Sequence, residues 1–291
     1  MQVNDTIHAL KIPFQIPVSP EKQITRVVYA FLIFGEKITL IDSGVSGADK
    51  LIFEYIEKNG RDPGKVHTLI LSHSHPDHIG SAQRIKEKTG CRILAHPAEK
   101  NWIEDTEKQA RERPVPGFNL LVDGPVAIDG LLENNETVSL EDAITCQVFH
   151  TPGHSAGSLS LHLAKEKTLF TGDALPLPGD LPIYDDITAC MQSIKKLHRL
   201  SEDVEILLSS WEAPIHGNEN IRTRIMAGVD YLERIHETVM EAHEGNKENI
   251  MKLCKEVVTA LALPPFAANP LVARAFASSL DVSADENLFT L

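Results

Sequence analysis

One run of nine residues constrains this chain more than any other segment. It reads Ser-His-Ser-His-Pro-Asp-His-Ile-Gly at residues 72–80, between an apolar run at residues 68–71 and a helical pattern at residues 79–89. Three imidazoles and one carboxylate within six residues are costly to bury, because every buried polar group needs a partner. The pattern therefore predicts a functional turn between a strand and a helix. The alternative is a polar turn with surface histidines.

The residue types of this turn are those that bind metal ions. His73 and His75 alternate onto one side of an extended backbone, and Asp77 and His78 face the same cavity from the first helical turn. Zinc and similar metals prefer imidazole nitrogen and carboxylate oxygen as ligands. We therefore expect all four side chains to be metal ligands.

A second candidate ligand lies in the segment His-Thr-Pro-Gly-His-Ser-Ala-Gly-Ser at residues 150–158. The segment separates two strand-like runs, and Pro152 and Gly153 shape a turn that can direct His154 into a cleft. A lone histidine in a loop usually means nothing. Here, His154 would complete a three-imidazole site with the first two histidines of the earlier turn.

A third candidate follows a strand pattern at residues 168–170. The sequence Phe-Thr-Gly-Asp ends this strand and places Asp173 at its carboxyl edge, where α/β sheets hold their sites. A Gly-Asp pair also forms ordinary turns. In this order along the chain, a carboxylate that bridges two metal ions is the better interpretation.

Together, HSHPDH, TPGHSAGS and FTGD, preceded by LIDSG, make residues 20–215 resemble the metallo-β-lactamase superfamily. The resemblance implies an α/β (α+β) fold, a four-layer αββα sandwich with the site along one edge of its two packed sheets. Asp42 of LIDSG matches a position that supports the ligands from behind. The resemblance also implies two metal ions, the first held by His73, His75 and His154, and the second by Asp77 and His78 with Asp173 bridging.

The sequence departs from this family at one expected ligand. The superfamily usually supplies a last histidine after a late strand, in a Gly-His context, whereas here the strand pattern at residues 206–208 runs into Trp211. Glu212, His216 or a water molecule would have to fill that position. A single metal ion, or a different metal, is therefore an alternative.

Two regions are expected along the chain. Residues 1–215 alternate strand and helix patterns and form the metallo-β-lactamase-like catalytic domain, and residues 216–291 form a small helical C-terminal region. The irregular segment at residues 108–136 is expected to be a long loop, either a substrate lid or a plain surface excursion. The C-terminal region has helical patterns at residues 220–242, 247–262 and 271–280. Its apolar face indicates packing on the main domain or else dimerisation.

The resemblance implies a metal-dependent hydrolase. Two divalent ions, with Zn²⁺ as first choice and iron or manganese as alternatives, lower the pKa of a bridging water to about 7. The metal-bound hydroxide would attack the substrate, while Asp77 orients it and shuttles its proton. We expect a small ester, thioester or lactone, as in glyoxalase II-like (hydroxyacylglutathione hydrolase-like) enzymes. The alternatives are a nuclease or phosphodiesterase, an iron-dependent sulfur dioxygenase, and an inactive metal-binding fold.

The charge of the chain bears on its partners. It has 41 acidic and 28 basic side chains, a formal net charge of −13, which repels phosphate backbones and anionic lipid. The expected partner is therefore a small-molecule substrate, without nucleic acid or membrane, and a homodimer is an open alternative. No signal peptide or membrane-spanning stretch is evident, and four cysteines without CxxC spacing fit reduced thiols. We therefore expect a cytoplasmic protein.

Overall fold

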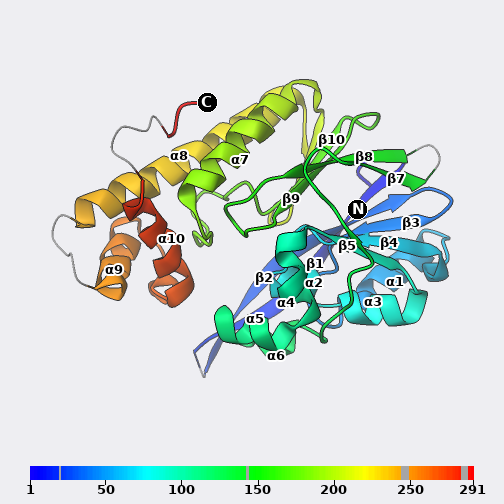
Figure 1. Cartoon of the computed structure of the whole chain (residues 1–291), viewed down its shortest axis with the longest axis horizontal. Coiled ribbons are helices and arrows are strands. Elements are labelled where there is room, and N and C mark those ends of the chain that lie inside the picture. The colour runs from blue at the N-terminus through cyan, green and yellow to red at the C-terminus, as the bar shows by residue number, and fades with distance from the viewer. Residues whose placement is uncertain (20, 142–143, 244–248, 283–287) are drawn as a thin grey trace. The chain divides into compact units, whose positions relative to one another are not determined.

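Two six-stranded β-sheets form the framework of the protein (Figure 1). The structure is a computed structural model that describes residues 1–19, 21–141, 144–243, 249–282 and 288–291. The first sheet has the order β1-β2-β3-β4-β5-β6, antiparallel up to β3 and parallel from β3 to β6. Its strands are β1 (Ile7–Ser19), β2 (Lys22–Phe34), β3 (Ile38–Ile41), β4 (Val66–Ile70), β5 (Arg92–Ala95) and β6 (Gly130–Leu131).

The second sheet has the order β12-β11-β10-β9-β8-β7, and its members from β7 to β10 are antiparallel. The two sheets meet through apolar side chains. The ring of Phe31 on β2 packs edge-on against that of Phe170 on β10, with centroids 5.4 Å apart. The strands of this sheet are β7 (Thr137–Glu141), β8 (Ile144–His150), β9 (Leu159–Leu163), β10 (Thr168–Gly172), β11 (Ile206–Ser209) and β12 (Ile215–His216).

Helices α1 (Ala48–Lys58) and α3 (Ala82–Thr89) contribute to the core of the first sheet. Ile52 and Ile56, four residues apart on α1, fall on one face of the helix and join a buried cluster with Leu40 of β3. All three side chains are 0% exposed. The apolar residues at helical spacing therefore pack α1 against the buried face of the first sheet. Shorter elements are α2 (Pro76–Ile79), α4 (Lys100–Glu104), α5 (Thr106–Glu112), α6 (Phe118–Leu121) and 3-10 turns at Pro63–Lys65, Pro97–Glu99, Ser201–Asp203 and Pro265–Ala267.

The chain divides into two compact units, each built from several segments. The first unit holds residues 1–150, 159–172 and 207–214, and the second holds residues 151–158, 173–206 and 215–291. In the second unit α8 contacts α7, α9 and α10. The expected domain boundary after residue 215 stays a prediction. The helices of the second unit are α7 (Ile187–Leu200), α8 (Asn218–His243), α9 (Ile250–Ala260) and α10 (Pro270–Leu280).

The expected fold class is confirmed, since two mixed sheets are combined with helices and the C-terminal region is helical. The three predicted C-terminal helices correspond to α8, α9 and α10. The first residues of the second one, 247–248, lie outside the described residues. Among the helices that the structure describes, none is long and apolar enough to cross a membrane.

The sequence analysis missed strand β1 and mistook one segment for a loop. Pro13 and Pro17 lie within β1, and proline disfavours a strand unless it lies at the edge of a sheet. β1 is an edge strand, so these prolines remove no ladder bond that the sheet needs. The segment at residues 108–136 is not one long loop, because it includes the end of α5, the whole of α6 and the short strand β6.

Replacing Ile52 with alanine should lower the free energy of unfolding by about 2–5 kcal/mol, because truncation leaves a cavity in the core. Leu51, the preceding residue of α1, is 40% exposed. The control Leu51→Ala should change the free energy by less than about 0.5 kcal/mol. Urea unfolding followed by circular dichroism measures both variants, and equal losses would contradict the described packing.

Candidate metal centre

The histidine-rich turn connects β4 to α2. Pro76 occupies the first helical position, where its fixed φ suits the helix, and the residue before a proline is held in extended backbone. His75 accordingly has φ −63° and ψ 149°. The turn is buried, with His73 and His78 0% exposed and His75 4% exposed.

The four predicted ligands of this turn lie together. The rings of His73 and His75 have centroids 4.5 Å apart at an angle of 80°, and those of His73 and His78 are 4.0 Å apart at 47°. Oδ2 of Asp77 lies 3.5 Å from Nε2 of His78. These side chains lie close together within the first unit, and their role as metal ligands stays a prediction.

A single buried carboxylate, that of Asp42, organises the turn. Asp42 follows β3 directly and is 1% exposed. Its Oδ1 accepts a hydrogen bond from the N–H of Ser72 at 2.7 Å. Its Oδ2 accepts one from Oγ of Ser72 at 2.8 Å and lies 2.8 Å from Nδ1 of His78. Asp42 was predicted to support the metal ligands, and in the structure its carboxylate contacts Ser72 and His78.

These bonds define which nitrogen of each imidazole carries the proton. An ionised carboxylate only accepts, so Nδ1 of His78 is the donor to Asp42. Because Ser72 donates its hydroxyl proton to the same carboxylate, its oxygen accepts from Nδ1 of His73, 3.0 Å away. In the neutral form of both histidines Nε2 is then the nitrogen with a lone pair, which is the form that binds a metal ion.

Two buried side chains that the sequence analysis did not single out hold Ser74, the residue between His73 and His75. Glu99 accepts hydrogen bonds from the N–H of Ser74, at 3.0 Å, and from its hydroxyl. Gln109 donates from Nε2 to the carbonyl of Ser74 at 2.5 Å. The one sequence signal for Glu99 is its place after β5, a strand parallel to β4, because neighbouring parallel strands end at the same edge.

The other two predicted ligands meet in the second unit. Nε2 of His154 lies 3.2 Å from Oδ2 of Asp173, and their side chains are 9% and 4% exposed. The loop that carries His154 is closed by a bond from the N–H of Thr151 to the carbonyl of Ser158 at 2.8 Å. An imidazole and a carboxylate that are distant in sequence are therefore brought within contact distance.

This loop is anchored to the start of α7 through Gly153. The carbonyl of Gly153 accepts bonds from the N–H groups of Asp185 and Asp186, at 2.7 and 3.1 Å. The side chain of Asp186 caps α7 by accepting from the N–H of Ala189. Gly153 has φ +126°, and a Cβ there would lie 2.3 Å from the backbone nitrogen of Cys190. Only glycine fits, and the residue before His154 is therefore fixed.

Trp211, at the position of the expected last histidine, packs on the first sheet. The guanidinium of Arg26 lies 4.4 Å from the centroid of its ring, and the ring of Phe14 is 6.4 Å away. Glu212 accepts a hydrogen bond from Oγ of Ser209 at 3.0 Å, and His216 is exposed. In the described parts of the chain, the groups of side chains that could hold a metal ion include neither Glu212 nor His216.

The cysteines do not offer a nucleophile. All four are free and buried, as the sequence analysis expected. Burial raises the pKa of the Cys146 thiol to about 12 and that of Cys254 to about 11, and it raises the pKa of Cys190 further. A thiolate is the reactive form of cysteine, so covalent catalysis by these residues is disfavoured at neutral pH.

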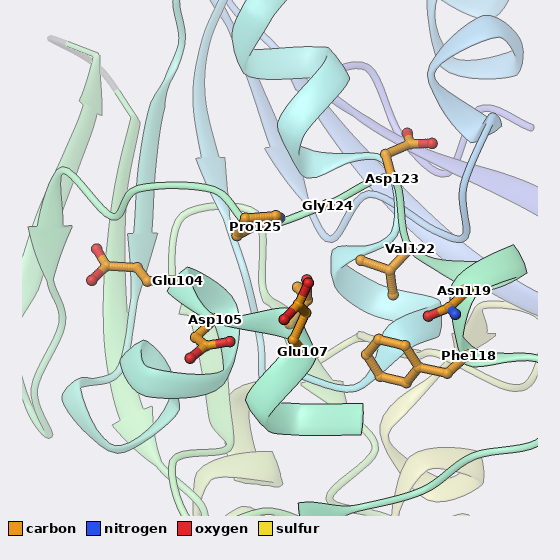
Figure 2. A pocket seen from close by; sticks show the side chains of 10 residues that line it. Glu104, Asp105, Glu107, Phe118, Asn119, Val122, Asp123, Gly124 and Pro125 are labelled. Carbon is orange, nitrogen blue, oxygen red and sulfur yellow. The ribbon is translucent and has the colours of Figure 1, made fainter. Parts of the chain in front are cut away.

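A cavity of about 430 Å³ lies between α5 and α6 in the first unit (Figure 2). Its wall combines acidic side chains with the ring of Phe118. Two of these carboxylates serve the backbone, since Asp105 accepts from the N–H of Lys108 and Glu104 from that of Ile128. None of the predicted metal ligands lines this cavity. The residues that line it are Glu104, Asp105, Thr106, Glu107, Phe118, Asn119, Val122, Asp123, Gly124 and Pro125.

Comparison with known proteins places the chain in a family. The sequence model of the metallo-beta-lactamase superfamily matches residues 24–209, more than half of the chain, and the protein therefore belongs to this superfamily. A probable metallo-hydrolase of Methanocaldococcus jannaschii is 31% identical over 186 residues, which are 61% of this chain and 82% of the relative. A hydroxyacylglutathione hydrolase of Pelagibacter ubique is 25% identical over 206 residues, 64% of this chain and 77% of the relative. The chain spans 64% of a Bacillus subtilis relative and 63% of a Mycobacterium bovis one.

Solved structures of low sequence identity share the fold. A metallo-beta-lactamase family protein from Thermus thermophilus has a TM-score of 0.73 at 19% identity, covering 96% of this chain and 94% of that one. A beta-lactamase domain protein from Burkholderia ambifaria has a TM-score of 0.69 at 18% identity, covering 97% and 88%. The resemblance drawn from the motifs is thus confirmed, and at the level of the family so is the prediction of a metal-dependent hydrolase.

Replacing Gly153 with alanine should destabilise the protein by about 2–6 kcal/mol, because a positive φ costs about 1–3 kcal/mol and a clash in a packed site about 1–3 kcal/mol. Gly179 provides the control, since it also has a positive φ, +81°, but its Cβ would meet nothing within 4 Å. Thermal unfolding compares the two variants. A loss for Gly153→Ala no greater than that for Gly179→Ala would contradict the described anchoring.

Proposed function

We propose that this protein hydrolyses a small ester, thioester or lactone with the help of bound divalent metal ions, Zn²⁺ in the first place. The ligands would come from both units. The two ligand sets that we propose are His73 with His75 and His154, and His73 with His78 and Asp173. Asp77, beside His78, is proposed as a further ligand of the second ion.

The observation that carries this proposal is the set of hydrogen bonds that Asp42 organises around two histidines. His73 and His78 are buried, and their Nδ1 atoms are engaged as donors to Ser72 and Asp42. In the neutral imidazoles Nε2 then carries the lone pair, the ligand form that zinc takes in proteins. Neutral imidazoles with nearby carboxylates suit a divalent cation, so the residues present fit the group that the superfamily uses.

The course of the chain supports bringing ligands of the two units to one metal centre. The N–H of Leu159 donates to the carbonyl of Ser72 at 2.8 Å, and a Cβ on Gly172 would lie 3.1 Å from that of Ser72. Ser158 and Asp173 are the adjoining residues in the chain. Leu159 and Gly172, from which the chain continues to the loop of His154 and to Asp173, thus both lie beside Ser72 in the first unit.

When bound, a divalent ion lowers the pKa of a coordinated water and polarises the carbonyl of a substrate. The side chains supply the rest of the chemistry. Asp77 is 17% exposed in its side chain, the most accessible of the acidic and imidazole groups in the turn. We propose that Asp77 orients the attacking water and transfers the proton of that water to the leaving group.

The substrate class follows from the relatives and from charge. One relative, from Pelagibacter ubique, is a hydroxyacylglutathione hydrolase, and its name describes a thioester-cleaving enzyme. The net charge of −13 disfavours a phosphodiester polymer, so a small acyl compound is favoured over nucleic acid. Because Trp211 stands at the place of the expected last histidine, we expect the second ion to be bound less tightly than the first.

Replacing His75 or His154 with alanine should abolish hydrolysis and reduce bound metal, because each variant removes one imidazole from the same ligand group. His67→Ala is the matched control, since His67 is an exposed histidine on β4, the strand that leads to the turn. Turnover of a thioester and lactone panel and elemental analysis of the purified protein measure both effects.

Full hydrolytic activity after verified removal of all metal would sink the proposal. Elemental analysis also separates the metals, because stoichiometric iron in place of zinc would redirect it toward oxygen chemistry. Cleavage of a phosphodiester with no action on the acyl panel would replace the proposed substrate class while leaving the metal centre intact.

A further inference from the structure

Ser74 is fully buried, at 0% exposure, between His73 and His75. Its N–H and its hydroxyl both donate to one oxygen of Glu99, and its carbonyl accepts from Gln109. All three polar groups of this residue are therefore bonded to side chains from other segments of the chain. Glu99 and Gln109 therefore hold the histidine-rich turn in place through Ser74.

The bonds to Ser74 act on the two peptide groups that flank it. The N–H belongs to the planar peptide that joins Ser74 to His73, and the carbonyl belongs to the one that joins it to His75. Fixing both planes fixes the directions in which the two imidazoles leave the backbone. In extended backbone these two side chains project to one face and that of Ser74 to the other.

Glu99 and Gln109 are themselves held inside the protein. Glu99 ends the 3-10 turn that follows β5 and is 2% exposed, and Gln109 lies on α5 and is 0% exposed. Burying a carboxylate is unfavourable unless it gains strong hydrogen bonds. The carboxylate of Glu99 accepts two such bonds from Ser74, so it is coupled to the geometry of the turn.

We propose that Glu99 and Gln109 are positioning residues that orient His73 and His75 toward a shared metal ion. The inference rests on the metal centre proposed above. A prearranged pair of ligands loses less conformational freedom on binding, which raises affinity for the metal. Residues that hold ligands in this way typically contribute about 10- to 100-fold to metal affinity.

The test compares the Zn²⁺ affinities of variants of the full chain by competition with a chromophoric chelator. Glu99→Ala and Gln109→Ala should each weaken binding by about 10- to 100-fold. Glu99→Gln should lose less than Glu99→Ala, because its amide oxygen still accepts from Ser74. Glu87→Ala on α3 and Glu107→Ala on α5, both exposed, are the controls and should bind like the wild type.

Two further measurements distinguish positioning from plain packing. The visible absorption of the Co²⁺-loaded protein reports ligand geometry and should change in Glu99→Ala and Gln109→Ala. The melting temperature of the metal-free protein reports stability alone. Should Glu99→Ala fail to fold, Gln109→Ala and Glu99→Gln carry the comparison.

Unchanged Zn²⁺ affinity and an unchanged Co²⁺ spectrum in Gln109→Ala and Glu99→Ala, even with lower melting temperatures, would overturn the positioning role. Equal losses in Glu99→Gln and Glu99→Ala would overturn its basis in hydrogen bonding. A wild-type protein that binds no Zn²⁺ would overturn the metal centre itself, and with it this inference, so the two failures are told apart.

Discussion

The hydrogen bonds of the Asp42 carboxylate are the interaction on which the candidate metal centre depends. One oxygen binds the backbone of Ser72, and the other serves both its hydroxyl and the ring of His78. Through Ser72 the same carboxylate reaches the ring of His73. Position and protonation of two imidazoles thus follow from a single buried charge, which is stable there because each of its oxygens is engaged.

The order of strands in the first sheet explains how so many polar groups meet inside the protein. β3, β4 and β5 are adjacent and parallel, so their carboxyl ends share an edge. Asp42 follows the first of these strands, His73 follows the second, and Glu99 lies beyond the third. The turn after β4 is therefore supported from its two neighbours, one binding Ser72 and the other Ser74.

Much of this could be predicted from the sequence, and the reasons for the gaps are physical. His73, His75 and His78 stand in one short motif, so local spacing alone indicates their common face. Glu99 and Gln109 are single polar residues whose purpose is set by contacts with Ser74, 25 and 35 positions away. Strand β1 was not predicted because its two prolines disfavour a strand, and prolines are tolerated there only because β1 lies at the edge of the sheet. Neither the contacts of Ser74 nor the edge position of β1 can be read from the neighbouring residues in the sequence.

The backbone of Asp42 narrows what evolution can place there. Its φ of +60° lies in the left-handed region, which aspartate, asparagine and glycine enter far more readily than other residues. Of these, glycine offers no acceptor, and asparagine offers a neutral one. The amide of asparagine has one acceptor oxygen and an NH2 group that only donates, so it cannot accept the hydrogen bonds that reach both oxygens of Asp42. The left-handed backbone and these bonds together confine the residue after β3 to aspartate.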